Sequence, residues 1–193
     1  MGQLILIRPG QTDFDRDKRI QGKLDVPLNE DGKREVDLIA TDLAPLGVKT
    51  ILTGPCNPAL ETAELLGSRL NVPVKSLDSL RNLCQGLWEG LPIDEIKRMY
   101  PTIFKQWADS PETVKIPEGE PALEAIQRLA TMLKKYKKKK ETYAIVASEP
   151  IASFLHYLGV GQAVNVEDFT QGRKLPSWEI LGESTERESV NQN

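Results

Sequence analysis

The sequence predicts an α/β protein, a three-layer αβα sandwich with a mostly parallel central sheet. Short apolar runs alternate along the chain with longer segments that carry apolar residues at helical spacing. Strands that alternate with helices of this length favour βαβ units. The first run, Leu4 to Ile7, places four apolar residues in a row, which is typical of a strand buried on both faces of a parallel sheet.

A single domain is expected over residues 1–182. A chain of 193 residues with 39% hydrophobic content can bury one core of ordinary size. No internal repeat and no linker divides the sequence. Residues 183–193 are polar and lack a helix-capping pattern, so we expect them to form a frayed tail.

The first half of the chain alternates three predicted strands with two predicted helices. The polar stretch 13–28 contains Gly22 and Pro27 and is predicted as a loop. Asn29 is a typical N-cap residue, and apolar residues at helical spacing follow it. The remaining elements of this half are a strand at Thr50–Thr53, a helix with its apolar face at Ala59, Ala63, Leu66 and Leu70, and a short strand after Val72–Val74.

The second half begins with an irregular stretch at 80–91, which contains two glycines. Two short helices bounded by prolines are predicted at 93–100 and 102–108. The clearest helical pattern has apolar residues in steps of four and three. The apolar stripe of this helix consists of Ala122, Ile126, Leu129, Leu133 and Tyr136. A buried strand at Ala144–Ala147 and a helix at Ile151–Leu158 complete this half.

The composition excludes several classes of function. A formal net charge of -3 gives no general attraction to nucleic acid or membrane. The apolar N-terminal run is too short for a signal peptide or a membrane span. Two cysteines cannot form a disulfide framework, so we expect a reducing, cytoplasmic setting. The chain has one histidine, which excludes any mechanism that needs two.

A run of lysines at Lys134, Lys135 and Lys137–Lys140 marks the end of the longest predicted helix. Cations stabilise the negative end of a helix dipole, so we expect a solvated helix terminus. Weak contact with an acidic partner is the alternative. The sequence identifies no protein or small-molecule partner, and we expect no cofactor and no metal.

Arg8 is the first candidate functional residue. It follows the strand Leu4 to Ile7, and Pro9-Gly10 turns the chain directly after it. Ligands bind at the carboxyl ends of strands in open α/β sheets, and a guanidinium can grip a phosphate or carboxylate with two parallel hydrogen bonds. Neutralisation of a nearby acidic side chain is the alternative role.

Several segments together resemble the histidine phosphatase superfamily, in its phosphoglycerate mutase-like branch. Residues 8–12 (Arg-Pro-Gly-Gln-Thr) are similar to the family signature Arg-His-Gly-Glu/Gln-Thr. Further similar segments follow in the family's order between Leu4 and about Gly159. They are Arg19–Gly22, Thr53–Ala63, Leu80–Leu91 with its Gly-Leu-Trp-Glu-Gly run, Pro117–Glu120, and Ile145–Pro150. The resemblance implies the phosphoglycerate mutase-like form of the αβα sandwich.

The same resemblance implies that the catalytic positions of the family are replaced here. The family's nucleophilic histidine, second phosphate-binding arginine, carboxylic acid and second histidine correspond to Pro9, Pro58, Asn82 and Glu149. The predicted ligand-binding residues are therefore Arg8, Gln11, Thr12, Gln21, Gly22 and Glu149. We expect Glu149 to pair with Arg8 and to occupy the place of phosphate oxygens.

These replacements lead to a prediction of a catalytically degenerate member, a pseudoenzyme that acts as a binding, regulatory or scaffold module. Loss of one charge-stabilising donor costs about 10²–10³ in rate, and loss of the nucleophile removes the covalent route altogether. One alternative is a residual phosphatase or phosphoglycerate mutase-type enzyme that acts on phosphate esters by an unusual mechanism. Another is a small-molecule sensor for a neutral or cationic ligand, which Glu149 would favour.

Cys56, Asp13 and Asp15 are the candidate replacement nucleophiles. A thiolate near an arginine can be reactive, but Cys56 fills a position that is usually leucine in the family, so packing under the loop is preferred. The aspartates lack a metal-binding cluster to support such a route. His156 lies among apolar and aromatic residues and is interpreted as a packing or surface histidine.

Overall fold

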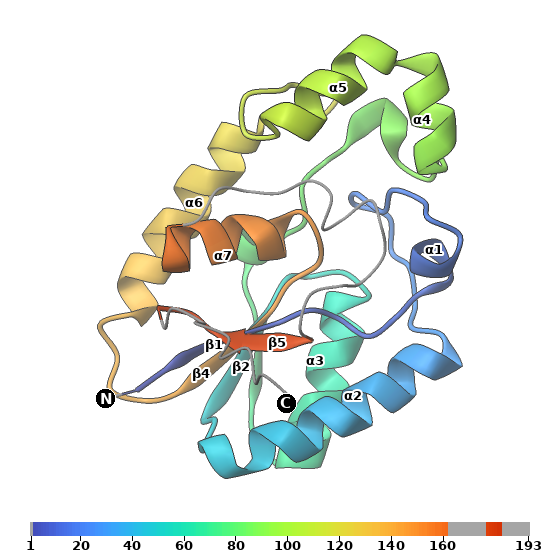
Figure 1. Ribbon diagram of the computed structural model, residues 1–193. Coiled ribbons are helices and arrows are strands. Elements are labelled where there is room, and N and C mark those ends of the chain that lie inside the picture. Colours follow the sequence, from blue (N-terminus) through green and yellow to red (C-terminus); the bar gives the residue numbers. More distant parts are fainter. Residues whose placement is uncertain (1, 162–176, 183–193) are drawn as a thin grey trace, which may run out of the picture.

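The computed structural model describes residues 2–161 and 177–182, and a mostly parallel sheet lies at its centre (Figure 1). The strand order in the described part of the chain is β3-β2-β4-β1-β5. The strands are β1 (Leu4–Ile7), β2 (Thr50–Thr53), β3 (Val74–Ser76), β4 (Tyr143–Val146) and β5 (Trp178–Ile180). All neighbouring pairs are parallel except β1 and β5, which are antiparallel. The predicted mostly parallel sheet is confirmed.

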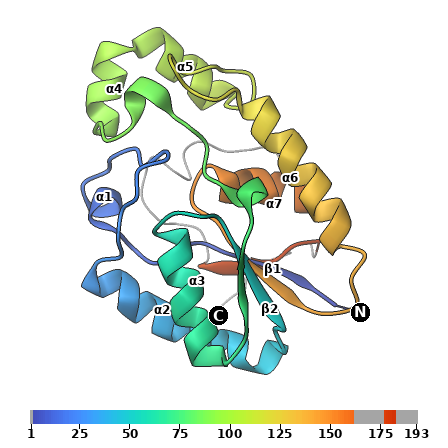
Figure 2. The ribbon, with the colours of Figure 1, turned by 180° about the vertical axis from the view of Figure 1, so that it is seen from behind.

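Helices cover both faces of this sheet (Figures 1 and 2). The helices are α1 (Asp13–Arg16), α2 (Glu30–Leu43), α3 (Ala59–Leu70), α4 (Ile93–Met99), α5 (Pro101–Asp109), α6 (Ala122–Tyr136) and α7 (Ile151–Val160). Short 3-10 turns lie at Ala44–Leu46, Asp78–Leu80 and Gly86–Trp88. Helices α2 and α3 pack on one face, and α6 and α7 pack on the other. The predicted three-layer αβα architecture is confirmed.

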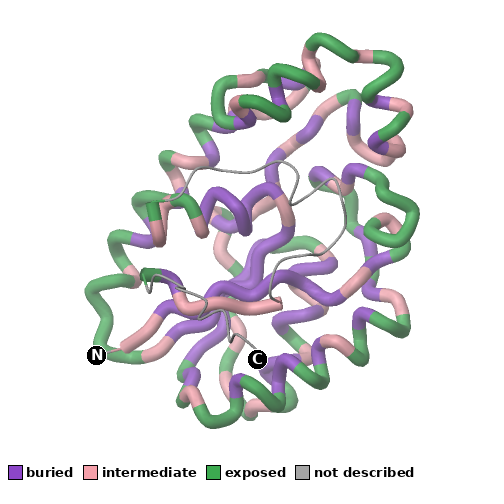
Figure 3. Tube along the Cα trace, in the orientation of Figure 1, coloured by how far each residue is buried: buried purple, intermediate pink, exposed green. Residues whose placement is uncertain are grey.

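The sheet is buried along both faces because its apolar residues alternate between the two helical layers (Figure 3). Within β1, Leu4 and Leu6 pack with residues of α6 and α7, whereas Ile5 and Ile7 pack with residues of α2 and α3. Successive side chains of a strand point to opposite faces, which gives this division. β1 therefore lies in the middle of the core and fixes where Arg8 leaves it.

Helices α4 and α5 form a small lobe at the end of α6 that lies away from the sheet (Figure 1). Trp88 is fully buried in this lobe and packs edge-on against Trp107, with the ring centroids 5.5 Å apart. Phe104 and Tyr100 pack against the same indole. The lobe thus has an aromatic core of its own, separate from the two clusters on the sheet.

Two elements differ from the sequence prediction. Residues 13–28, predicted as a loop, begin with the one-turn helix α1, because Thr12 and Asp15 form a reciprocal capping box. Strand β5 was not predicted, since it has only three residues and forms by pairing with β1. The predicted tail at 183–193 lies outside the described residues.

The described helices are short. The longest of them, α6, has 15 residues. Within residues 2–161 and 177–182, none is both long and apolar enough to span a bilayer.

Replacement of Leu129 by alanine tests how the α6 layer stabilises the fold. Leu129 is fully buried, and Leu123 on the same helix is 57% exposed. We expect Leu129→Ala to lower the free energy of unfolding by about 2–5 kcal/mol, because it leaves a cavity in the core. The control Leu123→Ala changes it by less than about 0.5 kcal/mol. Urea denaturation measures both, and equal losses would contradict the assignment of α6 faces.

Candidate functional site

Arg8, at the carboxyl end of β1, lies between two carboxylates that come from its neighbouring strands. β1 lies between β4 and β5 in the sheet. Arg8 Nε donates to Glu149 Oε1 at 3.0 Å, and Arg8 Nη1 donates to Glu179 Oε1, also at 3.0 Å. Glu149 follows β4, and Glu179 is the central residue of β5. The strand order therefore brings together three charged residues that are far apart in the sequence.

The side-chain alternation of the sheet explains why these groups meet on the α7 face. Glu179 pairs with Leu6 in the antiparallel register, so both side chains point to the same face. Leu6 packs in the cluster that includes α7. Arg8 is two residues beyond Leu6 and projects to that face as well.

Glu149 is held in place by the first turn of α7. Its Oε2 accepts hydrogen bonds from the Ser153 backbone N–H at 3.2 Å and from Ser153 Oγ at 2.7 Å. Pro150, the N-cap residue of α7, has no side-chain donor or acceptor, so Glu149 supplies the cap. A carboxylate is also favoured at the positive end of a helix dipole. The Glu149 carboxylate is thus held by Arg8 on one oxygen and by Ser153 on the other.

Glu179 joins Arg8 to the only histidine of the chain. Its Oε2 lies 2.6 Å from His156 Nδ1, and His156 belongs to α7. We name the five residues Arg8, Glu149, Ser153, His156 and Glu179 the Arg8 cluster. Two carboxylates thus share the one guanidinium of Arg8, and His156 lies against the second oxygen of Glu179.

The Arg8 cluster is mostly buried. The side chains of Arg8 and Glu179 are 6% and 10% exposed, whereas that of Glu149 is 24% exposed. Buried charges are tolerated when each is paired and hydrogen-bonded, so the two carboxylates depend on Arg8. Of these three ion-paired side chains, Glu149 is the most exposed.

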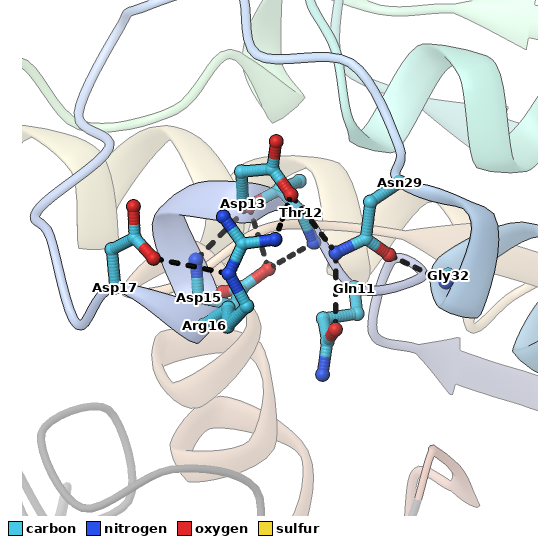
Figure 4. Close-up of polar contacts among 8 residues, drawn as sticks. All are labelled: Gln11, Thr12, Asp13, Asp15, Arg16, Asp17, Asn29 and Gly32. Atoms are coloured by element: carbon cyan, nitrogen blue, oxygen red, sulfur yellow. Dashed lines mark hydrogen bonds and ion pairs between the residues drawn. The ribbon is translucent and has the colours of Figure 1, made fainter.

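Gln11 and Thr12 serve the local structure of the loop after β1 (Figure 4). Gln11 Oε1 accepts from Asn29 Nδ2 at 3.0 Å, and the Gln11 backbone N–H donates to Glu35 Oε2 at 2.9 Å. The Thr12 backbone N–H and Oγ both donate to Asp15 Oδ2. None of these contacts in the described part of the chain reaches Arg8, so the two residues anchor the loop to α1 and α2.

Asn82 connects the loop of Gly22 to the backbone of Glu149. Its Nδ2 donates to Gly22 O at 2.8 Å and to Glu149 O at 3.1 Å. Gly22 has φ +56°, and a Cβ there would lie 2.3 Å from Glu89 Oε1, so glycine is required. Gln21 donates instead to Asn57 O at 2.9 Å. Of the six predicted ligand-binding residues, Arg8 and Glu149 are bonded to each other, and Gly22 is linked to them through Asn82.

The two prolines at family catalytic positions have structural places. Pro9 is buried directly after Arg8, and the next residue, Gly10, donates its backbone N–H to Thr62 Oγ1 at 3.1 Å. Pro58 is the N-cap residue of α3. Neither side chain has a polar atom that could accept a phosphoryl group.

The other candidate nucleophiles are placed differently from expectation. Cys56 is exposed, so the prediction that it packs under the loop is wrong, because the turn before α3 directs it outward. Asp15 is engaged by Thr12, and Asp13 pairs with Arg16. Within the described ranges, no group of three or more His, Cys, Asp or Glu residues is arranged to hold a metal ion.

Sequence reasoning missed Glu179 and Ser153 and gave His156 no link to Arg8. The signal for Glu179 was weak, since a glutamate between Trp178 and Ile180 reads equally well as a surface position. Ser153 lies four residues after Glu149, and Pro150, the N-cap residue between them, has no side chain that can cap the helix, which was the available clue.

A sequence model of the histidine phosphatase superfamily (branch 1) matches residues 4–187. The chain belongs to this superfamily. The resemblance of residues 8–12 and of the later segments is confirmed by this match over most of the sequence. Relatives include phosphoglycerate mutase-like proteins, in agreement with the predicted branch.

The relatives of this superfamily member carry the names of enzymes. This chain is 27% identical to phosphoserine phosphatase 1 of Hydrogenobacter thermophilus, and the match covers 76% of this chain and 69% of that protein. It is 31% identical to the probable phosphoglycerate mutase GpmB of Yersinia pestis over 69% of this chain and 62% of that protein. It is 32% identical to the uncharacterized phosphatase PhoE of Bacillus subtilis over 52% of each chain. The chain thus spans between about half and just over two thirds of the length of these relatives.

Solved structures show the same fold. Bacillus stearothermophilus YhfR superposes with a TM-score of 0.77 at 27% identity, covering 86% of this chain and 83% of that one. A mycobacterial glucosyl-3-phosphoglycerate phosphatase superposes with a TM-score of 0.79 at 23% identity, covering 93% and 92%. The predicted phosphoglycerate mutase-like fold is confirmed.

The prediction of a non-catalytic pseudoenzyme is wrong in the light of these relatives, which are named as phosphatases and phosphoglycerate mutases. That prediction rested on the replacement of the family's catalytic side chains at Pro9, Pro58, Asn82 and Glu149. It did not include the second carboxylate, Glu179, or the serine that orients Glu149. The alternative, an enzyme that acts on phosphate esters by an unusual mechanism, agrees better with the comparisons.

Replacement of Arg8 by methionine tests whether the two carboxylates depend on it. We expect Arg8→Met to lower the free energy of unfolding by about 3–5 kcal/mol, because it leaves buried carboxylates without their partner. The control Arg69→Met removes an exposed ion pair with Asp37 and should cost at most about 1 kcal/mol. Chemical denaturation measures both variants. If the free energy of unfolding falls by a similar small amount in both variants, the Arg8 contacts contribute little to stability.

Proposed function

We propose that this chain hydrolyses phosphate esters at the Arg8 cluster, by direct attack of water on phosphorus. The contact that supports the proposal most is the hydrogen bond from Arg8 Nε to Glu149 Oε1 at 3.0 Å. It holds a guanidinium and a carboxylate side by side at the carboxyl ends of β1 and β4, and in the proposed reaction the first binds the phosphoryl group and the second accepts a proton. Membership in a superfamily whose relatives are named phosphatases and mutases supports the same reaction class.

Direct attack by water fits the residues around Arg8. Pro9 offers no nucleophile, and a covalent phosphoenzyme therefore has no side chain to form on at that position. Phosphoryl transfer is accelerated mainly by positioning and by positive charge near the transferred group. Arg8 supplies that charge, and a water molecule held by Glu149 supplies the nucleophile.

The proposed step balances without any further reactant. Water attacks phosphorus, and Glu149 accepts the proton that the water loses. The bond between phosphorus and the ester oxygen breaks with its electron pair on the oxygen. The departing oxygen then takes the proton from Glu149, so that ester and water become phosphate and alcohol and the enzyme returns to its initial state.

Ser153 and Asn82 act as positioning residues in this reaction. Ser153 holds Glu149 Oε2, which leaves Oε1 directed toward Arg8. Asn82 holds the backbone oxygen of Glu149 and ties it to the loop of Gly22. A base that is fixed within hydrogen-bond reach of its water needs no reorganisation when the reaction occurs.

Replacement of Glu149 by glutamine tests the proposed base. We expect turnover of p-nitrophenyl esters of phosphate by purified protein, and Glu149→Gln should lower kcat by about 10²–10⁴ without raising KM. Release of p-nitrophenolate, followed by absorbance, gives both constants.

Cys56→Ser is the matched control for a thiol mechanism, because Cys56 is exposed and has no place in the proposed step. Its kcat and KM should equal those of the wild-type chain. Absence of turnover of any phosphate ester, full activity in Glu149→Gln, or loss of activity in Cys56→Ser would each refute the proposal.

A further inference from the structure

We propose that the lysines at the end of α6 dock a short acidic segment of a partner protein. Six lysines lie within seven residues there, and we name them the α6 lysine patch: Lys134, Lys135 and Lys137–Lys140. The first two belong to the last turn of α6, and Lys137 is its C-cap residue. The patch takes no part in the proposed hydrolysis, so the two proposals stand or fall separately.

The α6 lysine patch is exposed, and its charges are not compensated by carboxylates. All six of its residues are exposed. Within residues 2–161 and 177–182, none of the six forms an ion pair, although Lys33 and Lys97 are paired with acidic residues on their own helices. Lys135 Nζ lies over the ring of Tyr136, 5.7 Å from its centroid. The patch is therefore open to an anionic partner.

The dipole of α6 accounts for only part of this charge. The carboxyl end of a helix carries about half of an elementary negative charge, and its effect fades beyond the last turn. Lys134 and Lys135, in the last turn of α6, already exceed that charge. Lys138–Lys140 lie beyond the helix and its C-cap, so stabilisation of the helix leaves their presence unexplained.

The patch lies at the edge of the sheet opposite to the Arg8 cluster. It directly precedes β4, which runs parallel to β1, and Arg8 follows β1 at the carboxyl ends of the strands. Figure 1 shows the end of α6 close to the N-terminus of the chain, where β1 begins. A partner held by the patch therefore leaves the Arg8 cluster uncovered.

The residue types in the patch favour carboxylates over nucleic acid. Every cation in it is a lysine, which acts as a compact point charge and lacks the planar fork with which arginine grips phosphate. Proteins that bind single-stranded nucleic acid also present aromatic side chains on which bases stack. Tyr136, the aromatic residue within the patch, packs edge-on against Tyr143, with the ring centroids 5.0 Å apart. The contact with the partner is therefore one of charge alone.

The rest of the chain favours a short partner segment over an extended anionic surface. The chain has 25 basic and 28 acidic residues, so the six lysines leave 19 basic residues against the 28 acidic ones. Seven residues at the helical rise cover about 10 Å, which is close to one Debye length in 0.1 M salt. A duplex or a lipid surface reaches well beyond that distance and faces the acidic remainder, whereas a short acidic segment meets only the patch.

Fluorescence anisotropy of a fluorescein-labelled octaglutamate peptide tests the proposal. We expect the wild-type chain to bind this peptide at neutral pH in about 20 mM NaCl. The Kd should rise at least about tenfold in about 200 mM NaCl, because salt screens contacts between exposed charges. Absence of binding at the lower salt concentration, or binding that salt does not weaken, would overturn the proposal.

Replacement of Lys138–Lys140 by glutamine tests whether the patch is the binding surface. We expect this triple variant to bind the peptide at least about fivefold more weakly than the wild-type chain, because three of the six charges are removed. The matched control replaces three exposed lysines elsewhere, Lys75, Lys105 and Lys115, by glutamine, which makes the same change in net charge. The control should change the Kd by less than about twofold. Equal weakening in the two triple variants would overturn the assignment to the patch.

Two extended anionic probes distinguish the acidic segment from the other partners that a lysine cluster can bind. They are a 20-base-pair DNA duplex and vesicles of phosphatidylglycerol and phosphatidylcholine in equal parts, both in the low-salt buffer. We expect each to bind more weakly than the peptide, with Kd expressed per anionic group, because the acidic remainder of the chain repels them. Tighter binding of the duplex would reassign the patch to nucleic acid, and tighter binding of the vesicles would reassign it to a membrane. Either result would refute the acidic segment.

Discussion

One guanidinium shared by two carboxylates is the constraint on which the candidate site depends. Arg8 is buried at the carboxyl end of β1, and Glu149 and Glu179 reach it from the two strands beside β1. Removal of Arg8 leaves both carboxylates without their shared cationic partner in a region with little water. The strand order of the sheet and the chemistry of the site are therefore coupled, because only the arrangement β4-β1-β5 brings the three residues together.

The surrounding polar contacts restrict this cluster further. Ser153 and His156, both on α7, each hold one of the carboxylates, and Asn82 fixes the backbone of Glu149 from the opposite loop. Gln11 and Thr12 stiffen the turn after β1 through hydrogen bonds to α1 and to the start of α2. The loops at this end of the sheet thus position Arg8 and its partners through direct hydrogen bonds, and the base of the proposed reaction is already oriented before a substrate arrives.

Much of the fold could be predicted from the sequence because its signals are local. The apolar runs at 4–7 and 50–53 coincide with β1 and β2, and the stripe from Ala122 to Tyr136 coincides with α6. The contact between Arg8 and Glu149 was also expected, from the family positions that they fill, and the hydrogen bond is present. Strand β5 and Glu179 could not be found in the same way. A three-residue strand has almost no periodicity, and its position is determined by pairing with β1, which is more than 170 residues away in sequence.

The interpretation of function failed for a related reason. Replacement of family residues at Pro9, Pro58, Asn82 and Glu149 describes what the site has lost, and a sequence read position by position shows only that side. The three-dimensional arrangement adds a second carboxylate, an orienting serine and a histidine, none of which lies near Arg8 in the sequence. Function in such a site follows from the charges that surround the retained arginine.

A crystal structure grown without phosphate, sulfate or other multivalent anions is the most direct measurement of this arrangement. We expect Arg8 to keep Nε on Glu149 and Nη1 on Glu179 at hydrogen-bond distance, with Ser153 on the second oxygen of Glu149. A structure in which either carboxylate is turned away from Arg8, with water in its place, would contradict it.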